Sequence, residues 1–336
     1  MKKLTHIITF LLQAAQLLGT VSCDLLKEGP DEAHSSDSAR DVSCLLHISQ
    51  SANASSASFY CTDLRAFVFD ADCSDLDSWQ EISLDGVAAG GTVQINSSSG
   101  EKVFVITANV PPERFTYYNT VNLQSFRSFL CPLEEEDPSR PFMAGVAYGP
   151  AGPGEPLEIV LQPLLARVRI RSLEINFSER DAYRDSTLKD IRCYLTNVNS
   201  AAPLLPGADT LSLGILNASR LDETSLRGFQ HPEMLLCDSP AGGALLYCYP
   251  SRARGDGSFS DTVTRLVIEG RIGSTTYYYP IRIGGGVVER GREYCYDITL
   301  TRTGSLDPDT EIGCGAMDVF CTVEEWKDYE DEVEYY

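Results

Sequence analysis

The segment PLEIVLQPLLARVRIRSLEINF, residues 156–177, indicates the fold class of the chain. Apolar and polar residues alternate along it in two successive runs, which is typical of two β-strands that each place one face on a core. The Pro- and Gly-rich stretch GPAGPGEP at 149–156 has strong strand patterns on both sides and therefore predicts a hairpin loop rather than a linker. We expect the boundary between two domains near residues 162–166.

Strand patterns extend from this segment in both directions. Val42, Cys44, Leu46 and Ile48 alternate with the residues between them, and similar short runs recur through the second half of the chain. Helical periodicity is sparse, and only residues 117–130 predict one helix or a helical turn. Many short strands separated by turn residues favour an all-β chain built of sandwiches over alternating α/β units. A length of 336 residues suits two such domains better than one.

The charge balance argues against nucleic acid as a partner. The chain has 48 Asp and Glu against 27 Lys and Arg, a formal net charge of -21. Such a body repels polyanions and anionic membrane surfaces. The same acidity is also what plain solubility outside the cell would require.

The N-terminal residues predict export and a lipid anchor. Two lysines follow Met1, an apolar run covers residues 4–18, and the run ends in GTVSC at 19–23. Small residues directly before a cysteine look like a lipobox, in which the cysteine is acylated and becomes the mature N-terminus. Thr20 departs from the usual Leu or Val. The alternative is an ordinary secretory signal cleaved nearby.

This interpretation gives residues 1–22 as the signal peptide, Cys23 as the lipidation site and residues 23–40 as a polar tether without periodicity. Several acyl chains on Cys23 would hold the protein on the outer membrane without a spanning helix.

The remaining cysteines number ten, and an even number in an exported chain permits disulfides. None of them shows a CxxC spacing, which argues against zinc sites and thioredoxin-type redox chemistry. Scattered cysteines on strands can equally be small buried apolar residues, and the sequence leaves the pairing open. They are Cys44, Cys61, Cys73, Cys131, Cys193, Cys237, Cys248, Cys295, Cys314 and Cys321.

The sequence predicts no catalytic site, no metal site and no cofactor. Its four histidines include no HExxH motif, and it contains no phosphate-binding loop and no GxGxxG. The acidic run EEED at 134–137 predicts an exposed loop. The Arg-Gly-Asp triplet at 254–256 is either an integrin-type adhesion motif or a chance tripeptide in a turn that favours Gly and Asp.

Several longer stretches resemble the fimbrillin family of Bacteroidales, the type V pilus subunits, over nearly the whole mature length. Gly291 stands where that family often has Asn. The stretches are DLRAFVFD at 63–70, PFMAGVAYG at 141–149, LEIVLQPLLARVRIRSL at 157–173, DIRCYLTNVNSAAPLLPG at 190–207, TRLVIEGRIGSTTYYYPIRI at 264–283 and VVERGREYCYDITLTRTGSLDPD at 287–309.

The resemblance implies two tandem transthyretin-like Greek-key β-sandwiches, at 41–163 and 164–310, followed by a C-terminal strand and acidic tail at 311–336. It also implies other fimbrial subunits as partners. Polymerising members of the family lose an N-terminal strand to an Arg-specific protease, and a neighbour's C-terminal strand then fills the groove. An added strand pairs the exposed backbone groups and covers the apolar groove.

One departure predicts a different fate for the first strand here, the strand that carries Val42, Cys44, Leu46 and Ile48. The stretch after it, residues 51–63, contains no Arg and no Lys. Since the flanking arginines lie before the strand and inside the next one, we expect the first strand and the lipid to be retained. Retention is most similar to the FimB-type anchor lipoproteins of the family.

The tail at 317–336 has two interpretations. Val319, Cys321 and Val323 share one face of a strand, and Trp326 follows. These residues could form a donor strand for a neighbouring subunit, or the last strand of the chain's own sheet with an acidic, solvated end.

Two other functions stay open on the same fold. The first is a tip or accessory fimbrial adhesin. The second is a surface lipoprotein that binds glycans, which exposed aromatic residues aligned across one sheet face would favour. The sequence identifies no host receptor.

Overall fold

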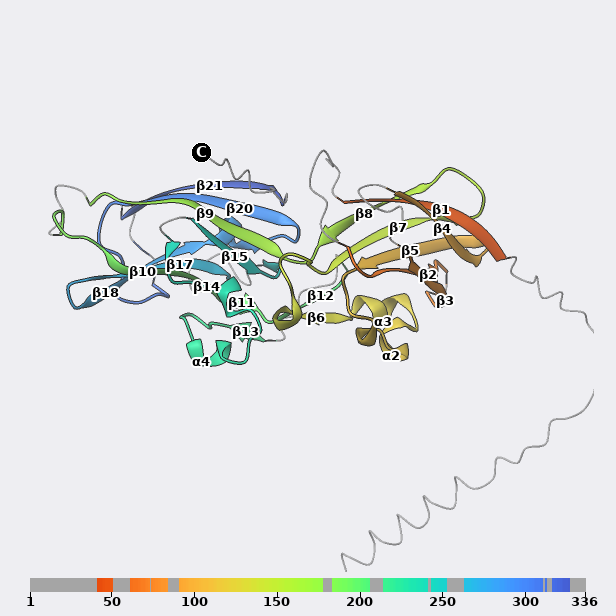
Figure 1. The fold of residues 1–336 in the computed structure, drawn as a ribbon, viewed down its shortest axis with the longest axis horizontal. Helices are drawn as coiled ribbons and strands as arrows, with labels where there is room; N and C mark the ends of the chain where they lie inside the picture. The colour runs from red at the N-terminus through yellow and green to blue at the C-terminus, as the bar shows by residue number, and fades with distance from the viewer. Residues whose placement is uncertain are drawn as a thin grey trace, which may run out of the picture. The chain divides into compact units, whose positions relative to one another are not determined.

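The computed structural model describes residues 41–50, 61–72, 74–83, 91–177, 183–205, 214–240, 243–252, 263–310, 312 and 316–326. The signal peptide, the tether with Cys23, the Arg-Gly-Asp triplet at 254–256 and the tail beyond Trp326 lie outside the described residues. The described chain is all-β, as predicted, and its strands form two β-sandwiches (Figure 1).

The first sandwich is a single seven-stranded sheet folded into two layers, with the strand order β3-β2-β5-β7-β8-β1-β4. The sheet bends between β7 and β8, which are paired only at Met143–Pro163 and Ala144–Gln162. The strands are β1 (Asp41–Gln50), β2 (Leu64–Asp70), β3 (Leu76–Ile82), β4 (Gly91–Ser98), β5 (Gly100–Ala108), β7 (Met143–Ala151) and β8 (Leu157–Pro163).

Side chains tie together the two strands at the ends of this sheet. Gln80 Nε2 on β3 donates to Gln94 O on β4 at 2.9 Å, and the Asp77 carboxylate accepts from Ser98 N at 2.8 Å. These bonds satisfy part of the backbone that a sheet edge otherwise exposes. Polar side chains, rather than a backbone ladder, therefore join the β3 edge of one layer to the β4 edge of the other.

A helical segment covers the outer face of the β2 layer (Figure 1). Its Phe126 ring centroid lies 4.9 Å from that of Phe67 and 5.6 Å from that of Phe69. The helix or helical turn expected over 117–130 is two short helices, because extended Asn122 interrupts it and caps the second one by accepting from Ser125 N. The elements are η1 (Pro112–Arg114), α2 (Tyr117–Thr120), α3 (Leu123–Arg127), β6 (Leu130–Pro132) and η2 (Leu133–Glu135).

The second sandwich consists of two four-stranded sheets, β14-β10-β17-β18 and β15-β9-β20-β21. Its main strands are β9 (Ala166–Ile175), β10 (Lys189–Thr196), β14 (Leu236–Cys237), β15 (Ala244–Cys248), β17 (Arg265–Ile272), β18 (Thr275–Arg282), β20 (Arg292–Leu300) and β21 (Met317–Glu325). Its short elements are β11 (Val198–Asn199), β12 (Ala201–Pro203), β13 (Ile215–Leu216), α4 (Glu223–Leu226), η3 (Pro232–Met234), β16 (Ser251–Arg252), η5 (Ile283–Gly286) and β19 (Val287–Val288).

The two sandwiches repeat one arrangement of three strands. In the first, β1 pairs antiparallel with β4 and parallel with β8. In the second, β9 pairs antiparallel with β15 and parallel with β20. The opening strand of each sandwich thus lies in the same place, between an early strand and a late one.

The passage from one sandwich to the other is short and is reinforced by a second contact. Only Leu164 and Leu165 separate β8 from β9, and both are buried. Strand β6 of the first half also pairs with β12 of the second.

We predict that Gly145→Ala destabilises the first sandwich, because β7 and β8 approach closely at this residue. A Cβ on Gly145 would lie 2.6 Å from Ile159 Cγ2 and 2.6 Å from the carbonyl oxygen of Val160. Overpacking against backbone should lower the free energy of unfolding by about 1–3 kcal/mol, measured by urea denaturation. Gly152→Ala is the control, since a Cβ there meets nothing within 4 Å. Equal midpoints for the two variants would contradict the prediction.

Candidate assembly site

The first strand, β1, is an inner strand of its sheet. Eight residue pairs join it to β4 and five join it to β8. Since each ladder satisfies backbone N–H and C=O groups, loss of β1 would leave unpaired edges on both neighbours. The chain can therefore lose this strand only if another strand replaces it.

The side chains of β1 fill a groove in the core. Cys44, Leu46 and Ile48 are buried, with at most 3% of each exposed, and Val42 is half-buried against the same core. The Cys44 thiol donates to Ile95 O at 3.5 Å, and burial raises the pKa of Cys44, so this thiol is a packing group rather than a nucleophile. All four residues predicted for the first strand lie on one face.

The arginine that follows β1 in the described chain is inaccessible. Arg65 lies inside β2 with only 5% of its surface exposed. Its guanidinium donates to Val110 O at 3.1 Å and to Glu81 at 3.3 Å, and it lies over the Phe115 ring. An Arg-specific protease would have to unfold β2 before it could cut here.

The tail strand, β21, is the edge strand of the chain's own second sandwich. It pairs antiparallel with β20 along its whole length (Figure 1). Val319, Cys321 and Val323 share one face, on the core side of the sheet, because they pair with inward-facing residues of β20. This face is uncovered all the same, since 38% of Val319 and 52% of Val323 are exposed. Phe320, on the opposite face, is 62% exposed.

Trp326 fastens the end of this strand. Only 3% of it is exposed, and its backbone N–H donates to Gly291 O at 3.0 Å. The ring lies 5.6 Å from that of Tyr247, and the Arg167 guanidinium lies 5.0 Å from the centre of the indole. Trp326 thus holds an otherwise exposed edge strand through a cation–π contact and aromatic packing.

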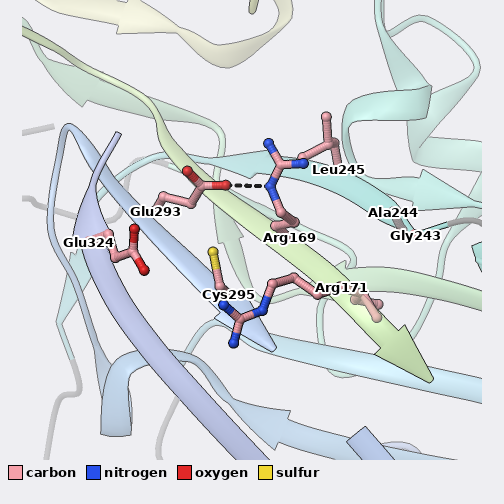
Figure 2. Close-up of a pocket in the computed structure, with 9 residues that line it drawn as sticks. Arg169, Arg171, Gly243, Ala244, Leu245, Glu293, Cys295 and Glu324 are labelled. Carbon is pink, nitrogen blue, oxygen red and sulfur yellow. Dashed lines mark hydrogen bonds and ion pairs between the residues drawn. The ribbon is translucent and has the colours of Figure 1, made fainter. Parts of the chain in front are cut away.

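A depression of about 620 Å³ lies beside this contact, on the outer face of the β15-β9-β20-β21 sheet. Figure 2 shows Arg169 and Glu293 pointing toward one another across it, with a 2.6 Å bond from Arg169 Nε to Glu293 Oε1. Arg167 binds the other oxygen of Glu293 at 2.7 Å. The lining includes Arg169, Arg171, Leu245, Glu293, Cys295 and Glu324.

The charges in this depression neutralise one another. Burial alone would raise the pKa of Glu293, but the bonds from Arg167 and Arg169 outweigh it and lower that pKa. Burial, and then the negative Glu293, raise the pKa of the Cys295 thiol to about 11. The thiol is therefore protonated at neutral pH and poorly suited to nucleophilic attack. The arrangement braces β9 against β20.

A buried carboxyl lies where the sequence predicted an exposed loop. Glu136, in the EEED run, is fully buried. It accepts from Phe142 N at 2.9 Å and lies 3.1 Å from the hydroxyl of Tyr249, which belongs to the second sandwich. The expectation was wrong for Glu136 because the η2 turn rotates this residue inward while its neighbour Glu134 stays exposed.

The buried carboxyl is protonated at neutral pH. Burial raises the pKa of Glu136 to about 8, against the lowering effects of the bonds from Phe142 and Tyr249. The Tyr249 hydroxyl also lies 3.2 Å from Pro132 O, so its single proton faces two acceptors, and a protonated Glu136 supplies the second proton. Arg290 extends the network by donating to Leu204 O at 2.8 Å and to Gln162 O at 3.2 Å.

Sequence reasoning missed this junction, because only tertiary contacts bring Glu136, Tyr249 and Arg290 together. It also missed Arg167 as the partner of Trp326. Within the described ranges, no group of three or more His, Cys, Asp or Glu side chains could hold a metal ion. A helix of sufficient length and apolarity to cross a membrane is likewise absent from the described part of the chain.

Comparison with solved structures identifies proteins that share this architecture, whereas comparisons of the sequence find none. No protein-family model matches the chain, and no curated protein matches its sequence. Among solved structures, the fimbrilin FimA of Porphyromonas gingivalis W83 matches with a TM-score of 0.65 at 15% identity, over 85% of this chain and 98% of that one. The tip fimbrial protein Mfa3 of Porphyromonas gingivalis, truncated at its C-terminus, matches with a TM-score of 0.55 at 16% identity, over 85% and 100%.

This chain has the fimbrillin fold. A candidate cell adhesion protein from Parabacteroides distasonis ATCC 8503 shares it, with a TM-score of 0.61 at 13% identity, over 85% of this chain and 99% of that one. At these identities the similarity shows the fold alone. This fold is the two-sandwich arrangement expected from the sequence.

We predict that Trp326→Ala loosens the tail strand. Truncating a buried tryptophan costs about 3–5 kcal/mol, and the loss falls on a strand with one neighbour and exposed faces. Amide hydrogen exchange across β21 should accelerate by at least about tenfold, read by mass spectrometry. Phe320→Ala is the control, because Phe320 is largely exposed. Unchanged protection of β21 in Trp326→Ala would show that Trp326 does not fasten the strand.

A second prediction concerns pH. Between its ordinary pKa of 4.5 and its folded pKa of about 8, the Glu136 carboxyl is mostly protonated in the folded chain and mostly ionised in the unfolded chain. Folding therefore takes up a proton, and the free energy of unfolding should fall as pH rises, by up to about 1.4 kcal/mol per pH unit.

Glu136→Gln should flatten this part of the profile, because the amide does not ionise. Urea denaturation midpoints at pH 5, 6, 7 and 8 provide the measurement. Glu134→Gln, at an exposed position of the same run, should keep the wild-type slope. The assignment fails if both variants follow the wild type.

Proposed function

We propose that this chain is a structural fimbrial subunit of the fimbrillin type. It is exported, acylated on Cys23 and held in the outer membrane, where it attaches the fimbria to the cell as the base subunit. Its role is structural rather than catalytic. The likeness to a fimbrilin and to a tip fimbrial protein supports the fimbrial part of this proposal.

The observation that carries the base role is the position of β1. Cys44, Leu46 and Ile48 fill the groove that a donor strand would occupy in a polymerising subunit. The sequence after β1 offers no Arg or Lys before Arg65, which is buried. A subunit that keeps this strand and is not cut at Arg40, directly before it, also keeps the tether and the lipid.

A subunit with a filled groove cannot accept a donor strand, so its bond to the next subunit must come from elsewhere. The tail supplies such a strand. The apolar face of β21 is exposed, and its outer backbone edge has no neighbouring strand in the described sheet. Both features are typical of an edge strand that can pair with a strand of another chain. We assign Val319, Cys321 and Val323 to this contact, whereas Trp326, which the sequence also suggested for it, is buried in the chain's own sandwich.

A second candidate function is binding at the surface, as a tip or accessory adhesin or as a glycan-binding lipoprotein. Trp79 and Tyr148 are 59% and 62% exposed and flank the helical segment on the outer face of the β2 layer. Tyr117 and Tyr118 on α2 are exposed as well. Exposed aromatic rings can stack on sugars, and the chain has only two tryptophans, of which Trp326 is buried. A change in tryptophan fluorescence during a glycan titration would favour this candidate.

The first test is the intact mass and N-terminal analysis of the protein from its native outer membrane. We expect an acyl adduct on Cys23 and no loss of residues 41–50. A soluble form without lipid that begins after residue 50 would overturn the base role and make the chain a polymerising stalk or tip subunit.

A matched pair of variants tests why β1 is retained. Ser56→Arg introduces an arginine after β1, and Ser56→Lys introduces the same charge. An Arg-specific protease should cut the purified Ser56→Arg chain once between residues 51 and 63 and leave this stretch uncut in wild type and Ser56→Lys. Cleavage of the wild type after β1 would remove the argument for retention.

A further inference from the structure

Two cysteines face each other across neighbouring strands of the second sandwich. Cys193 on β10 and Cys237 on β14 are directly opposed in an antiparallel pair. Directly opposed residues project from the same face of a sheet. In the part of the chain that the structure describes, no other two cysteines are paired in register.

The backbone already has the spacing that a disulfide needs. Opposed residues of an antiparallel pair have Cα atoms about 4.5–5.5 Å apart. Disulfides bridge Cα atoms about 4.4–6.8 Å apart. Side-chain rotation alone can therefore bring the two sulfurs into bonding contact.

The two thiols differ in access. Cys193 is fully buried in the sandwich core, whereas Cys237 is half-buried on the edge strand of its sheet. Burial, and next the neighbouring Cys237, raise the pKa of Cys193. Cys237 is thus the sulfur that an oxidant can reach first, and Cys193 is the one that resolves the intermediate.

We propose that Cys193 and Cys237 form a cross-strand disulfide on reaction with a disulfide-type thiol oxidant. The Cys237 thiolate attacks the oxidant disulfide, forming a mixed disulfide and releasing one thiol. Cys193 then attacks the Cys237 sulfur, the Cys193–Cys237 bond forms, and the second oxidant thiol leaves. The protein loses two electrons and two protons, and the oxidant takes up both. Formation in the cell rests on the proposed export, because oxidising compartments lie outside the cytoplasm.

The bond would secure a short edge strand of the second sandwich. Strand β14 is two residues long and is held to β10 by two residue pairs. It ends the segment that contains β13, α4 and η3, which side chains also bind to β10 through Asn217 Nδ2 to Leu195 O at 2.9 Å and Arg192 Nη1 to Glu223 Oε1 at 2.7 Å. A covalent link here would add a further attachment of this segment to β10.

Peptide mapping of the full chain tests the proposal. The purified, folded, reduced protein is incubated with oxidised glutathione, denatured, alkylated with iodoacetamide, and digested with trypsin and Asp-N without reduction. We expect residues 193–208 and 228–237 to be recovered as one linked species that dithiothreitol separates. Recovery of both peptides in alkylated form would overturn the proposal.

Thermal denaturation gives a second readout. Cys237→Ser should lower the Tm of the oxidised protein by about 5 °C or more. Dithiothreitol should lower the wild-type Tm to the same value and leave the variant unchanged, which a packing role alone would not produce. Cys321→Ser, at an exposed cysteine, should behave as wild type. A wild-type Tm that does not respond to dithiothreitol would contradict the bond.

Mapping the protein isolated from cells separates this proposal from the proposed function. Linked peptides from cells support both the bond and the export. If the bond forms with glutathione but the protein from cells carries free thiols, the disulfide site is supported and the proposed export is contradicted.

Discussion

The structure depends on one backbone arrangement, the insertion of an opening strand between an antiparallel and a parallel neighbour. In the first sandwich this strand is β1, and it fills the core with Cys44, Leu46 and Ile48. Removing such a strand would expose both a row of peptide groups and an apolar groove, each of which is costly in water. The groove must therefore be filled at all times, by the chain itself or by another chain.

The second sandwich repeats the arrangement with β9, but the consequences differ. Strand β9 continues directly from β8 through two buried leucines, so no processing at the N-terminus can release it. Strand β1 is instead preceded by residues 1–40 and separated from β2 by residues 51–63. In the second sandwich β21 is the edge strand beside β20, and the buried Trp326 follows it directly. On the proposed function, β1 and β21 are thus the strands concerned in contacts between subunits.

Between these ends the polar groups are arranged to hold the sheets in place. Arg167 and Arg169 share Glu293, and Arg167 also supports Trp326, so the brace of the sheet and the fastening of the tail use the same side chain. Glu136, Tyr249 and Arg290 link the first half of the chain to the second. A buried, protonated carboxyl suits such a contact, since it donates and accepts hydrogen bonds without the desolvation cost of a charge.

The sequence by itself determined the all-β class, the strand pattern and the passage between strands near residues 162–166, because alternation with period two and turn residues are local properties of a chain. It also placed Val42, Cys44, Leu46 and Ile48 on one face. Only the tertiary structure decided that the core-side face of β21 is uncovered, that Glu136 is buried and that Cys193 opposes Cys237. These properties depend on which strands become neighbours and on what covers each face, and pairings between residues far apart in the chain are not encoded in any local pattern.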